Sequence, residues 1–529
     1  MIKTHTKTSI YRLHIMSDAA VNNKRIAKNT LFLYFRTILI MLVTLYTSRV
    51  VLNTLGEGDY GVYNAVGGMV LMFTVISGAL SNAISRYITY GLGERKIENL
   101  KVIFCTSVNI QIVLAILVLI LCEALGVWFL NNKMTIPQDR LVAANWVLQC
   151  SLLSFVVNLI SVPYNACIIA HEHMSAYAYI SIFDAILKLS VAFLLITSPF
   201  DKLIAYSVLL LITAIVVRFL YGIYCGKHFE ECHYKPIYDK SLFKEMLGFA
   251  GWNFFGNATS ILNSQGINLL INIFFGVLAN SARGIASQVD AAVNQFVTTF
   301  TTAVNPQITK SYAQGDKSRM FYLICKGAKF SYLLLLFFAI PIFFEADRIL
   351  EIWLINVPEN APLFVRLSIL GAMVTVLGNT GYTACMATGN IKTYSTWITL
   401  VGSMAFFLTW VVYKLGAPVE SAYIVYIGVY IVVQIVRLIL MRRLLGFSII
   451  LFVKDVVAPI SFATILSLIV PWLISSILAP SALRVLFTFV LATIWTALCS
   501  FLTALTKGER ITLVSKGKAV IGKVFKTQI

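Results

Sequence analysis

Stretches of about 20 or more mostly apolar residues recur along the whole chain, and this feature constrains the fold most. An α-helix of that length crosses the hydrocarbon core of a bilayer. Of the 529 residues, 59% are hydrophobic and 12% are charged, whereas a soluble domain carries about 25% charged residues. The remaining polar surface is too small to cover a water-soluble globule. The sequence therefore predicts an all-α polytopic membrane protein.

Fourteen membrane spans are predicted from the apolar stretches. They cover residues 30–53, 61–90, 102–130, 140–162, 174–197, 203–225, 249–275, 283–308, 320–344, 362–387, 394–414, 419–441, 455–478 and 483–506. No apolar core of a cleavable signal peptide precedes them in residues 1–29. The expected organisation is therefore a short N-terminal segment followed by a continuous series of membrane helices.

The formal net charge of +19 is explained by membrane orientation, because Lys and Arg concentrate in the short segments between spans. With a cytoplasmic N-terminus, the inside segments hold 28 of these residues and the outside segments hold 7, as the positive-inside rule requires. An even number of spans then places both termini in the cytoplasm. No basic patch of nucleic-acid-binding type stands out, so we expect no nucleic-acid partner.

The two halves of the chain share a pattern, which predicts an internal repeat. Tyr-x-Ala-Cys occurs at residues 164–167 and again at 382–385, an offset of 218. Four separate landmarks keep the offset between 217 and 223. Because this period covers six spans, both halves insert in the same orientation. We therefore expect two parallel-repeat six-helix lobes plus two C-terminal helices.

The predicted boundaries follow from this repeat. Residues 1–29 form the N-terminal segment, and 30–225 and 249–441 form the two lobes. An inter-lobe loop of residues 226–248 joins them. The two added spans cover residues 455–506, and a basic cytoplasmic tail occupies residues 507–529.

Ionisable side chains inside spans are costly and are candidates for function. Nine are present, seven basic and two acidic: Arg36, Arg49, Arg86, Asp184, Lys188, Arg218, Arg283, Asp290 and Arg437. Three of the arginines lie near span ends, where the alternative is that they reach the headgroups; they are Arg49, Arg283 and Arg437. Asp184 and Lys188 have the i,i+4 spacing of an intrahelical ion pair.

An excess of buried cationic charge suits an anionic ligand, because arginine grips phosphate oxygens in a bidentate fork. The first, second, seventh and eighth spans also carry amides that can hydrogen-bond a sugar in a wet cavity: Asn64, Asn82, Asn253, Asn257, Asn263, Gln265, Asn268, Gln288 and Asn294. The alternative is that these amides join helices to one another.

Two His- and Cys-containing patterns imitate metal sites. They are Cys225-x-x-His228 with Cys232-His233, and His171-Glu172-His173. Both lie in short segments between spans without visible supporting ligands, so we expect no metal and no cofactor. A P-loop for ATP hydrolysis is also missing from the sequence.

Residues 46–56 (YTSRVVLNTLG) run into 59–64 (DYGVYN), and Gly67-Gly68 and Ser85-Arg86-Tyr87 follow. These residues resemble the polysaccharide-export branch of the MATE-like multidrug/oligosaccharidyl-lipid/polysaccharide superfamily, in particular its O-antigen and capsule flippases. The resemblance extends to the length, the arrangement of six, six and two spans, and the inside termini.

The resemblance implies a flippase of the bacterial inner membrane rather than an enzyme. Its cargo would be undecaprenyl-pyrophosphate-linked oligosaccharide, moved by alternating access through a cationic cavity. Arg49 and Arg86 lie in the resembling stretches, and our own analysis adds Arg36 and Arg283; all four would hold the pyrophosphate. Asp184 or Asp290 would couple transport to Na+ or H+. Polysaccharide assembly proteins are the expected partners besides the lipid bilayer.

Two other functions stay open. A MATE-type drug/cation antiporter has the same fold but needs acidic residues for cationic drugs, which the basic excess disfavours. A membrane polysaccharide polymerase or ligase needs a substantial outside loop with catalytic residues, and no predicted outside loop exceeds about 20 residues.

Overall fold

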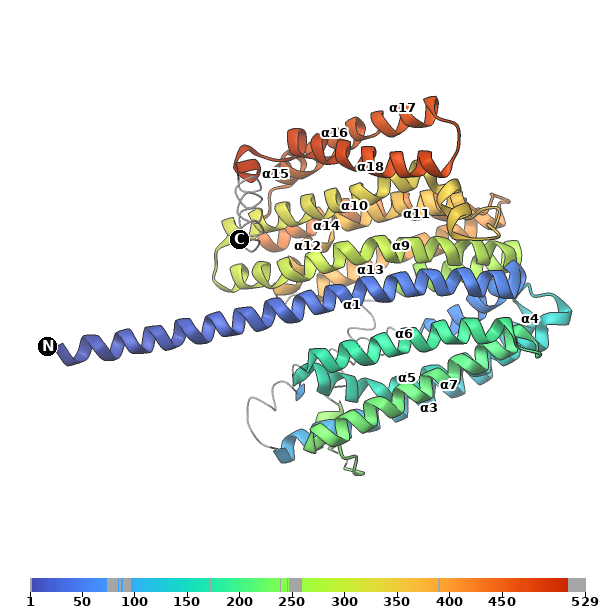
Figure 1. The fold of residues 1–529 in the computed structure, drawn as a ribbon, viewed down its shortest axis with the longest axis horizontal. Helices are drawn as coiled ribbons and strands as arrows, with labels where there is room; N and C mark the ends of the chain where they lie inside the picture. The colour runs from blue at the N-terminus through green and yellow to red at the C-terminus, as the bar shows by residue number, and fades with distance from the viewer. Residues whose placement is uncertain are drawn as a thin grey trace, which may run out of the picture. The chain divides into compact units, whose positions relative to one another are not determined.

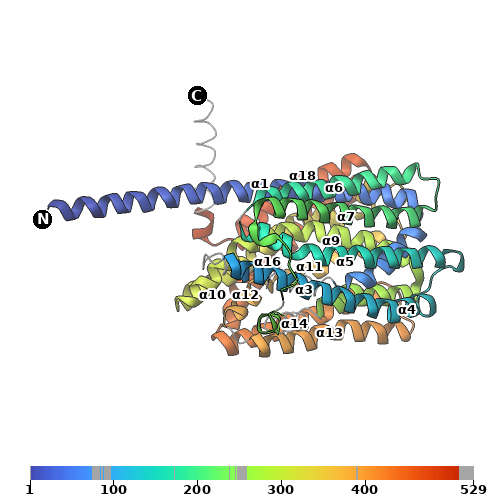
Figure 2. The ribbon, with the colours of Figure 1, turned by 90° about the horizontal axis from the view of Figure 1, so that it is seen from below.

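The computed structural model describes residues 2–73, 84, 87–88, 97–171, 173–237, 239–244, 246, 259–388 and 391–511, with side chains from residue 36 onward. Within these residues every regular element is a helix, which confirms the all-α prediction. The chain divides into two compact units, Met1–Phe254 and Phe255–Ile529 (Figures 1 and 2).

In the first unit, long helices run side by side in both views (Figures 1 and 2). They are α1 (Ile2–Leu71), α3 (Ile97–Leu121), α5 (Leu141–Ala170), α6 (Met174–Ile196) and α7 (Lys202–His228). A short helix, α4 (Val127–Asn132), precedes α5. Short turns of π- and 3₁₀-helix complete this unit at Cys122–Gly126, Gln138–Arg140 and Glu230–Cys232.

The second unit repeats this order and adds further helices at its C-terminal end. Its repeated part comprises the π-turn η4 (Leu262–Gly266), α9 (Ile267–Ala313), α10 (Lys317–Trp353), α11 (Ala361–Val376), α12 (Asn379–Ala387), α13 (Ile391–Lys414) and α14 (Ser421–Leu445). The added helices are α15 (Ile449–Phe452), α16 (Ala458–Ser467), α17 (Ile469–Ile477) and α18 (Ala482–Cys499).

The starts of corresponding helices reproduce the offset seen in the sequence. From α3 to α10 and from α5 to α11 the first residues differ by 220; from α6 to α13 they differ by 217, and from α7 to α14 by 219. The predicted repeat is therefore a repeat of secondary structure.

In the described part of each unit the chain reverses at a glycine inside one continuous helical segment, at Gly56 and at Gly276. These reversals occupy the stretches 54–60 and 276–282 that separate the predicted spans. Gly276 has φ 77° and ψ −171° inside α9. Asn280 donates to the carbonyl oxygen of Asn268 over 2.8 Å, although 12 residues of straight helix span about 18 Å. Residues 267–275 and 277–313 are therefore two arms of a helical hairpin.

Gly56 makes the equivalent reversal in α1, with φ 77° and ψ 169°. On the first arm, Tyr46 contacts Phe193 near the end of α6. Past Gly56, the second arm returns along the other helices of its unit, because Tyr63 contacts Tyr206 at the start of α7. Only glycine adopts this backbone conformation readily, so one residue replaces a polar loop in each hairpin.

Eleven helices of the described residues are long and apolar enough to cross a membrane, by length and composition. Two of these eleven contain the glycine reversals at Gly56 and Gly276, and α10 adds a further helix of 37 residues. The described helices are therefore compatible with a number of spans near the predicted fourteen. Large apolar side chains such as Ile116, Leu117 and Ile120 of α3 are exposed, as lipid contact requires.

An arginine clamp holds the first hairpin at its turn. Arg140 Nε donates to Asp59 over 2.7 Å, and its Nη1 donates to Asp201 over 2.7 Å. Asp201 also caps α7 through the backbone N–H groups of Leu203 and Ile204, and the hydrogen bond from Arg140 lowers the pKa of Asp201. Asp59 of the Asp-Tyr-Gly stretch thus ties α1 to the starts of α5 and α7.

Two buried ion pairs attach α18 and the segment that follows it to α10. Glu345 is 1% exposed and accepts from Arg484 over 2.9 Å and from Thr488 over 3.0 Å. Lys329 donates to Glu509 over 2.7 Å. Burial alone would raise the pKa of Glu509, but the hydrogen bond from Lys329 opposes it and the net shift is downward.

Candidate functional site

The candidate site of the second unit is built on the π-turn η4 in the first arm of the α9 hairpin. A π-turn breaks the regular hydrogen-bond ladder and often marks a functional position. Here the carbonyl oxygens of Asn263 and Ser264 accept from Nη2 of Arg283 over 3.3 and 3.0 Å. Arg283 lies on the second arm, so the hairpin itself positions the guanidinium. Close packing also shapes the turn, because a Cβ at Gly266 would lie 2.9 Å from the Phe406 ring.

Asn263 orients a free hydrogen-bond acceptor at the same place. Its Nδ2 donates to the carbonyl oxygen of Gly402 over 3.0 Å and to the Tyr430 hydroxyl over 3.2 Å. Its Oδ1 is buried and has no hydrogen-bond partner within the described residues. A buried acceptor without a partner is costly, so this oxygen leaves unmet hydrogen-bonding capacity behind the cavity wall.

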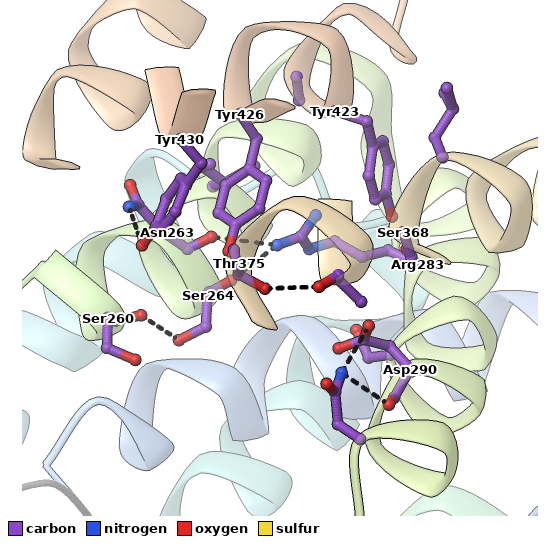
Figure 3. A pocket seen from close by; sticks show the side chains of 16 residues that line it. Ser260, Asn263, Ser264, Arg283, Asp290, Ser368, Thr375, Tyr423, Tyr426 and Tyr430 are labelled. Carbon is purple, nitrogen blue, oxygen red and sulfur yellow. Dashed lines mark hydrogen bonds between the residues drawn. The ribbon is translucent and has the colours of Figure 1, made fainter. Parts of the chain in front are cut away.

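Three tyrosines of α14 face the guanidinium. Tyr423, Tyr426 and Tyr430 follow one another at i, i+3 and i+7, which places them on one helix face. The Arg283 guanidinium carbon lies 5.5 Å from the centre of the Tyr423 ring. The rings of Tyr426 and Tyr430 stack with their centres 4.3 Å apart. Figure 3 shows these side chains pointing into one cavity.

Asp290 supplies a carboxylate on the same face of α9, seven residues after Arg283. Its Oδ1 accepts from Asn294 Nδ2 over 3.0 Å, and no ion pair within 4.0 Å joins it to a cation in the described part of the chain. Asp290 lies 14 residues beyond Gly276, about 21 Å along the helix. That distance places it well inside a hydrocarbon core of about 30 Å.

Together these groups line a cavity of about 200 Å³ in the second unit. Helices α9, α11 and α14 supply its walls, and Ser260, Ser287, Ser368 and Thr375 add hydroxyl groups (Figure 3). The cavity holds one guanidinium, one carboxylate, amides, hydroxyls and aromatic faces. It can hydrogen-bond a polar group that is too small to be a whole lipid-linked glycan.

The structure brings Arg283 and Asp290 into this cavity, and it places Arg36 elsewhere, in the first unit. Arg36 Nη2 donates to Ser181 over 2.9 Å, and its guanidinium carbon lies 4.4 Å from the centre of the Tyr177 ring. Arg49 is partly buried on α1. Arg86 lies outside the described residues.

Asp184 forms the intrahelical ion pair that its spacing indicated. Its Oδ2 accepts from Lys188 Nζ over 2.7 Å, and both side chains are partly exposed on α6. Two further arginines within spans contact tyrosines. The Arg218 guanidinium carbon lies 3.9 Å from the centre of the ring of Tyr164, the first residue of a Tyr-x-Ala-Cys motif. Arg437 donates to the Tyr394 hydroxyl over 2.8 Å.

The tyrosine face of α14 and the carbonyl oxygens of η4 were not predicted from the sequence. The i, i+3, i+7 spacing of Tyr423, Tyr426 and Tyr430 was the available signal, but tyrosine also fits an ordinary membrane helix. No sequence pattern marked the π-turn. Asn263 and Asn294, which were among the amides assigned to a wet cavity, do line it.

Solved transporter structures share this fold. The lipid II flippase MurJ in an inward closed conformation is 14% identical, covers 90% of this chain and 98% of its own, and has a TM-score of 0.65. The inward-facing conformation of a multidrug resistance MATE family transporter of the MOP superfamily is 12% identical, covers 76% of this chain and 94% of its own, and has a TM-score of 0.60. The outward-facing conformation of a multidrug resistance MATE family transporter of the MOP superfamily is 12% identical, covers 79% of this chain and 96% of its own, and has a TM-score of 0.58.

No family model matches the chain, and no curated protein matches it. The structural likeness spans nearly the whole of MurJ and of the MATE transporter. It shows that the chain is a multi-pass membrane protein with the fold common to them, as the sequence predicted.

Proposed function

We propose that the chain is a flippase that moves an anionic lipid-linked oligosaccharide across the membrane by alternating access. The cargo class is undecaprenyl-pyrophosphate-linked oligosaccharide, such as an O-antigen or capsule repeat unit. The membrane is the bacterial inner membrane, with both chain termini in the cytoplasm. The observation that carries the proposal is a guanidinium, that of Arg283, fixed in a polar and aromatic cavity within a membrane unit.

The cavity chemistry suits the head of such a lipid. Arg283 retains N–H groups beyond the Nη2 that donates to η4, and a guanidinium is an effective partner for phosphate oxygens. Sugar hydroxyls can hydrogen-bond the side chains of Ser260, Ser287 and Thr375, and the faces of Tyr423 and Tyr426 offer flat apolar surfaces. With about 200 Å³, the cavity accommodates part of the head group. Arg36, Arg49 and Arg86 are proposed as further ligands of the pyrophosphate.

Asp290 is the proposed coupling residue for Na+ or H+. Its carboxylate lies in the same cavity as Arg283, so protonation or cation binding there changes the charge that the cargo meets. This residue also favours the second candidate function, a MATE-type antiporter, because a carboxylate in a membrane cavity can bind a cationic drug.

The test compares complementation of a gene-deletion strain by matched variants. We expect deletion to remove surface glycan and to accumulate lipid-linked repeat units on the cytoplasmic side. Arg283→Ala should lower export by about 10- to 100-fold, because hydrogen bonds to charged groups contribute about 1.5–3 kcal/mol. Arg283→Lys should restore part of it, and Arg348→Ala should complement fully, because Arg348 only pairs with Glu351 at the surface.

Two results would contradict the proposal. One is unchanged surface glycan in the deletion strain. The other is full export by Arg283→Ala together with increased sensitivity of the deletion strain to cationic drugs, restored by the wild type and not by Asp290→Asn. That second pattern would identify the antiporter.

A further inference from the structure

A cluster of three thiols and one carboxylate lies at one end of the first unit. Cys167 belongs to the last turn of α5, Cys225 to the last turn of α7, and Glu231 and Cys232 to the 3₁₀ turn that follows α7. All four are buried, with 0%, 0%, 4% and 5% of their surfaces exposed in that order. Two of these thiols come from segments 65 residues apart, so only the fold reveals the cluster.

The ligand atoms are close enough to share one ion. The Sγ atoms of Cys167 and Cys232 and a carboxylate oxygen of Glu231 all lie within 4.8 Å of one another. The Cys225 thiol, which donates to the Tyr164 carbonyl oxygen over 3.4 Å, is an electrostatic neighbour of the Cys232 thiol. In a tetrahedral zinc site the ligand atoms are about 3.6–3.8 Å apart, from Zn–S and Zn–O bonds of about 2.3 and 2.1 Å. Small side-chain adjustments would therefore bring the cluster to that geometry.

We propose that Cys167, Cys225, Glu231 and Cys232 bind one Zn²⁺ ion. Thiolates are the preferred ligands of this ion in structural sites, and four protein ligands make a closed site. Binding displaces the three thiol protons to solvent, since thiolate is the form that coordinates. The ion fastens the end of α7 and the segment after it to the end of α5.

The surroundings compensate the negative charge that three thiolates and a carboxylate would bring. His171 Nε2 lies 2.5 Å from Glu231 Oε1, and its ring stacks on Phe229 with centres 4.1 Å apart. The positive charges of Lys101 and Arg218 favour the ionised forms of Glu231 and Cys225, respectively. A histidine that orients a ligating carboxylate is the kind of supporting contact that metal sites use.

The cluster differs from the cysteine and histidine pattern visible in the sequence. His228 is outside it, because its ring stacks on Tyr224 with centres 4.2 Å apart and its Nδ1 contacts the Tyr224 carbonyl oxygen. Cys167 takes part instead. The sequence pattern contained only residues close together in the chain, whereas the cluster in the structure includes Cys167 from another helix.

The internal repeat supplies a matched control. Cys385 is the counterpart of Cys167 at the offset of 218, and it is equally buried. At the same offset the counterparts of Cys225 and Cys232 are Arg443 and Ile450. Helix packing in this fold therefore needs neither of those two thiols. Among the described residues, such a cluster was found in the first unit alone.

The experiment measures metal in the full-length chain purified in detergent. After removal of metal with a chelator and addition of Zn²⁺, we expect about one zinc per chain. Co²⁺ used as a probe should give thiolate-to-cobalt charge-transfer absorption. Cys167→Ser and Cys232→Ser should each weaken binding by at least about tenfold, and His171→Asn by about 10- to 100-fold. Cys385→Ser should bind as the wild type does.

The wild type alone can overturn the proposal, so variants that fail to fold do not leave it undecided. It is wrong if the reduced wild-type chain binds no zinc at micromolar free metal, or if bound cobalt lacks thiolate absorption. It is also wrong if Cys167→Ser and Cys232→Ser bind zinc as well as Cys385→Ser does. A Cys225–Cys232 disulfide in the chain purified under reducing conditions would also contradict the zinc proposal, because the two thiols would not be available as ligands.

Discussion

The hairpins of the two units place different side chains at corresponding positions. At the offset of 220 that relates Gly56 to Gly276, Tyr63 corresponds to Arg283. Tyr206 and Tyr423 are likewise counterparts, at an offset of 217. In the first unit Tyr63 packs on Tyr206 with ring centres 4.9 Å apart. In the second, the Arg283 guanidinium takes that place against Tyr423.

The same comparison applies to the acidic residue of the cavity. Asp290 corresponds to Val70, which is 3% exposed. Where the first unit has Tyr63 and Val70, the second has Arg283 and Asp290. These two differences replace an apolar contact in the first unit with a charged cavity in the second. The difference teaches that the repeat determines the backbone, while the candidate site arises where the two copies depart from each other.

The largest expected effect tests a feature that the second unit alone possesses, the anchoring of its added helices to α10. Arg484→Ala would leave Glu345 charged and buried without its cationic partner, which typically costs about 3–5 kcal/mol. Thermal unfolding in detergent should show this loss. Arg348→Ala is the control, since its exposed pair with Glu351 contributes about 0.5 kcal/mol or less.

A small effect of Arg484→Ala would contradict this view of the anchor. The double variant Arg484→Leu with Glu345→Leu sharpens the test, because it removes both charges and should recover much of the lost stability. If the double variant is as unstable as Arg484→Ala, shape rather than charge holds α18 to α10.

The next effect tests whether the two hairpins are equivalent. Gly56→Ala and Gly276→Ala should each destabilise the chain by about 1–3 kcal/mol, because a side chain is strained at φ near 77° with an extended ψ. Gly58→Ala is the control, since a Cβ there meets nothing within 4 Å. Unequal losses of stability for Gly56→Ala and Gly276→Ala, measured by thermal unfolding, would show that the two reversals contribute differently to the stability of the chain.

Much of the fold could be predicted from the sequence because membrane helices leave a signal in every stretch of 20 residues. The repeat was visible because Tyr-x-Ala-Cys recurs at an offset that the helices keep. The reversals could not be predicted, because a glycine with positive φ replaces the polar turn that normally separates two spans. Residues 54–60 and 276–282 therefore appeared to be loops.

The candidate site was only partly predictable. Charge alone indicated Arg283 and Asp290, since an ionised group is conspicuous in an apolar helix. The acceptors that hold Arg283 are main-chain carbonyl oxygens. Every residue has one, so the amino-acid sequence does not indicate which of them will bind the guanidinium. The tyrosines of α14 count as ordinary membrane residues until the fold turns them toward one cavity. Cys167 likewise joins Cys225 and Cys232 only through the packing of α5 against α7.

The smallest expected effect separates the two carboxylates proposed for ion coupling. Asp184 is paired with Lys188 on a partly exposed face of α6, and such i,i+4 pairs contribute about 0.2–0.5 kcal/mol. Lys188→Ala and Asp184→Asn should therefore leave thermal stability nearly unchanged and restore glycan export in the deletion strain. Asp290→Asn should restore little, because it removes the carboxylate of the cavity. The reverse outcome, export lost with Asp184→Asn and kept with Asp290→Asn, would move ion coupling to the first unit and leave the charged cavity of the second unit to bind cargo alone.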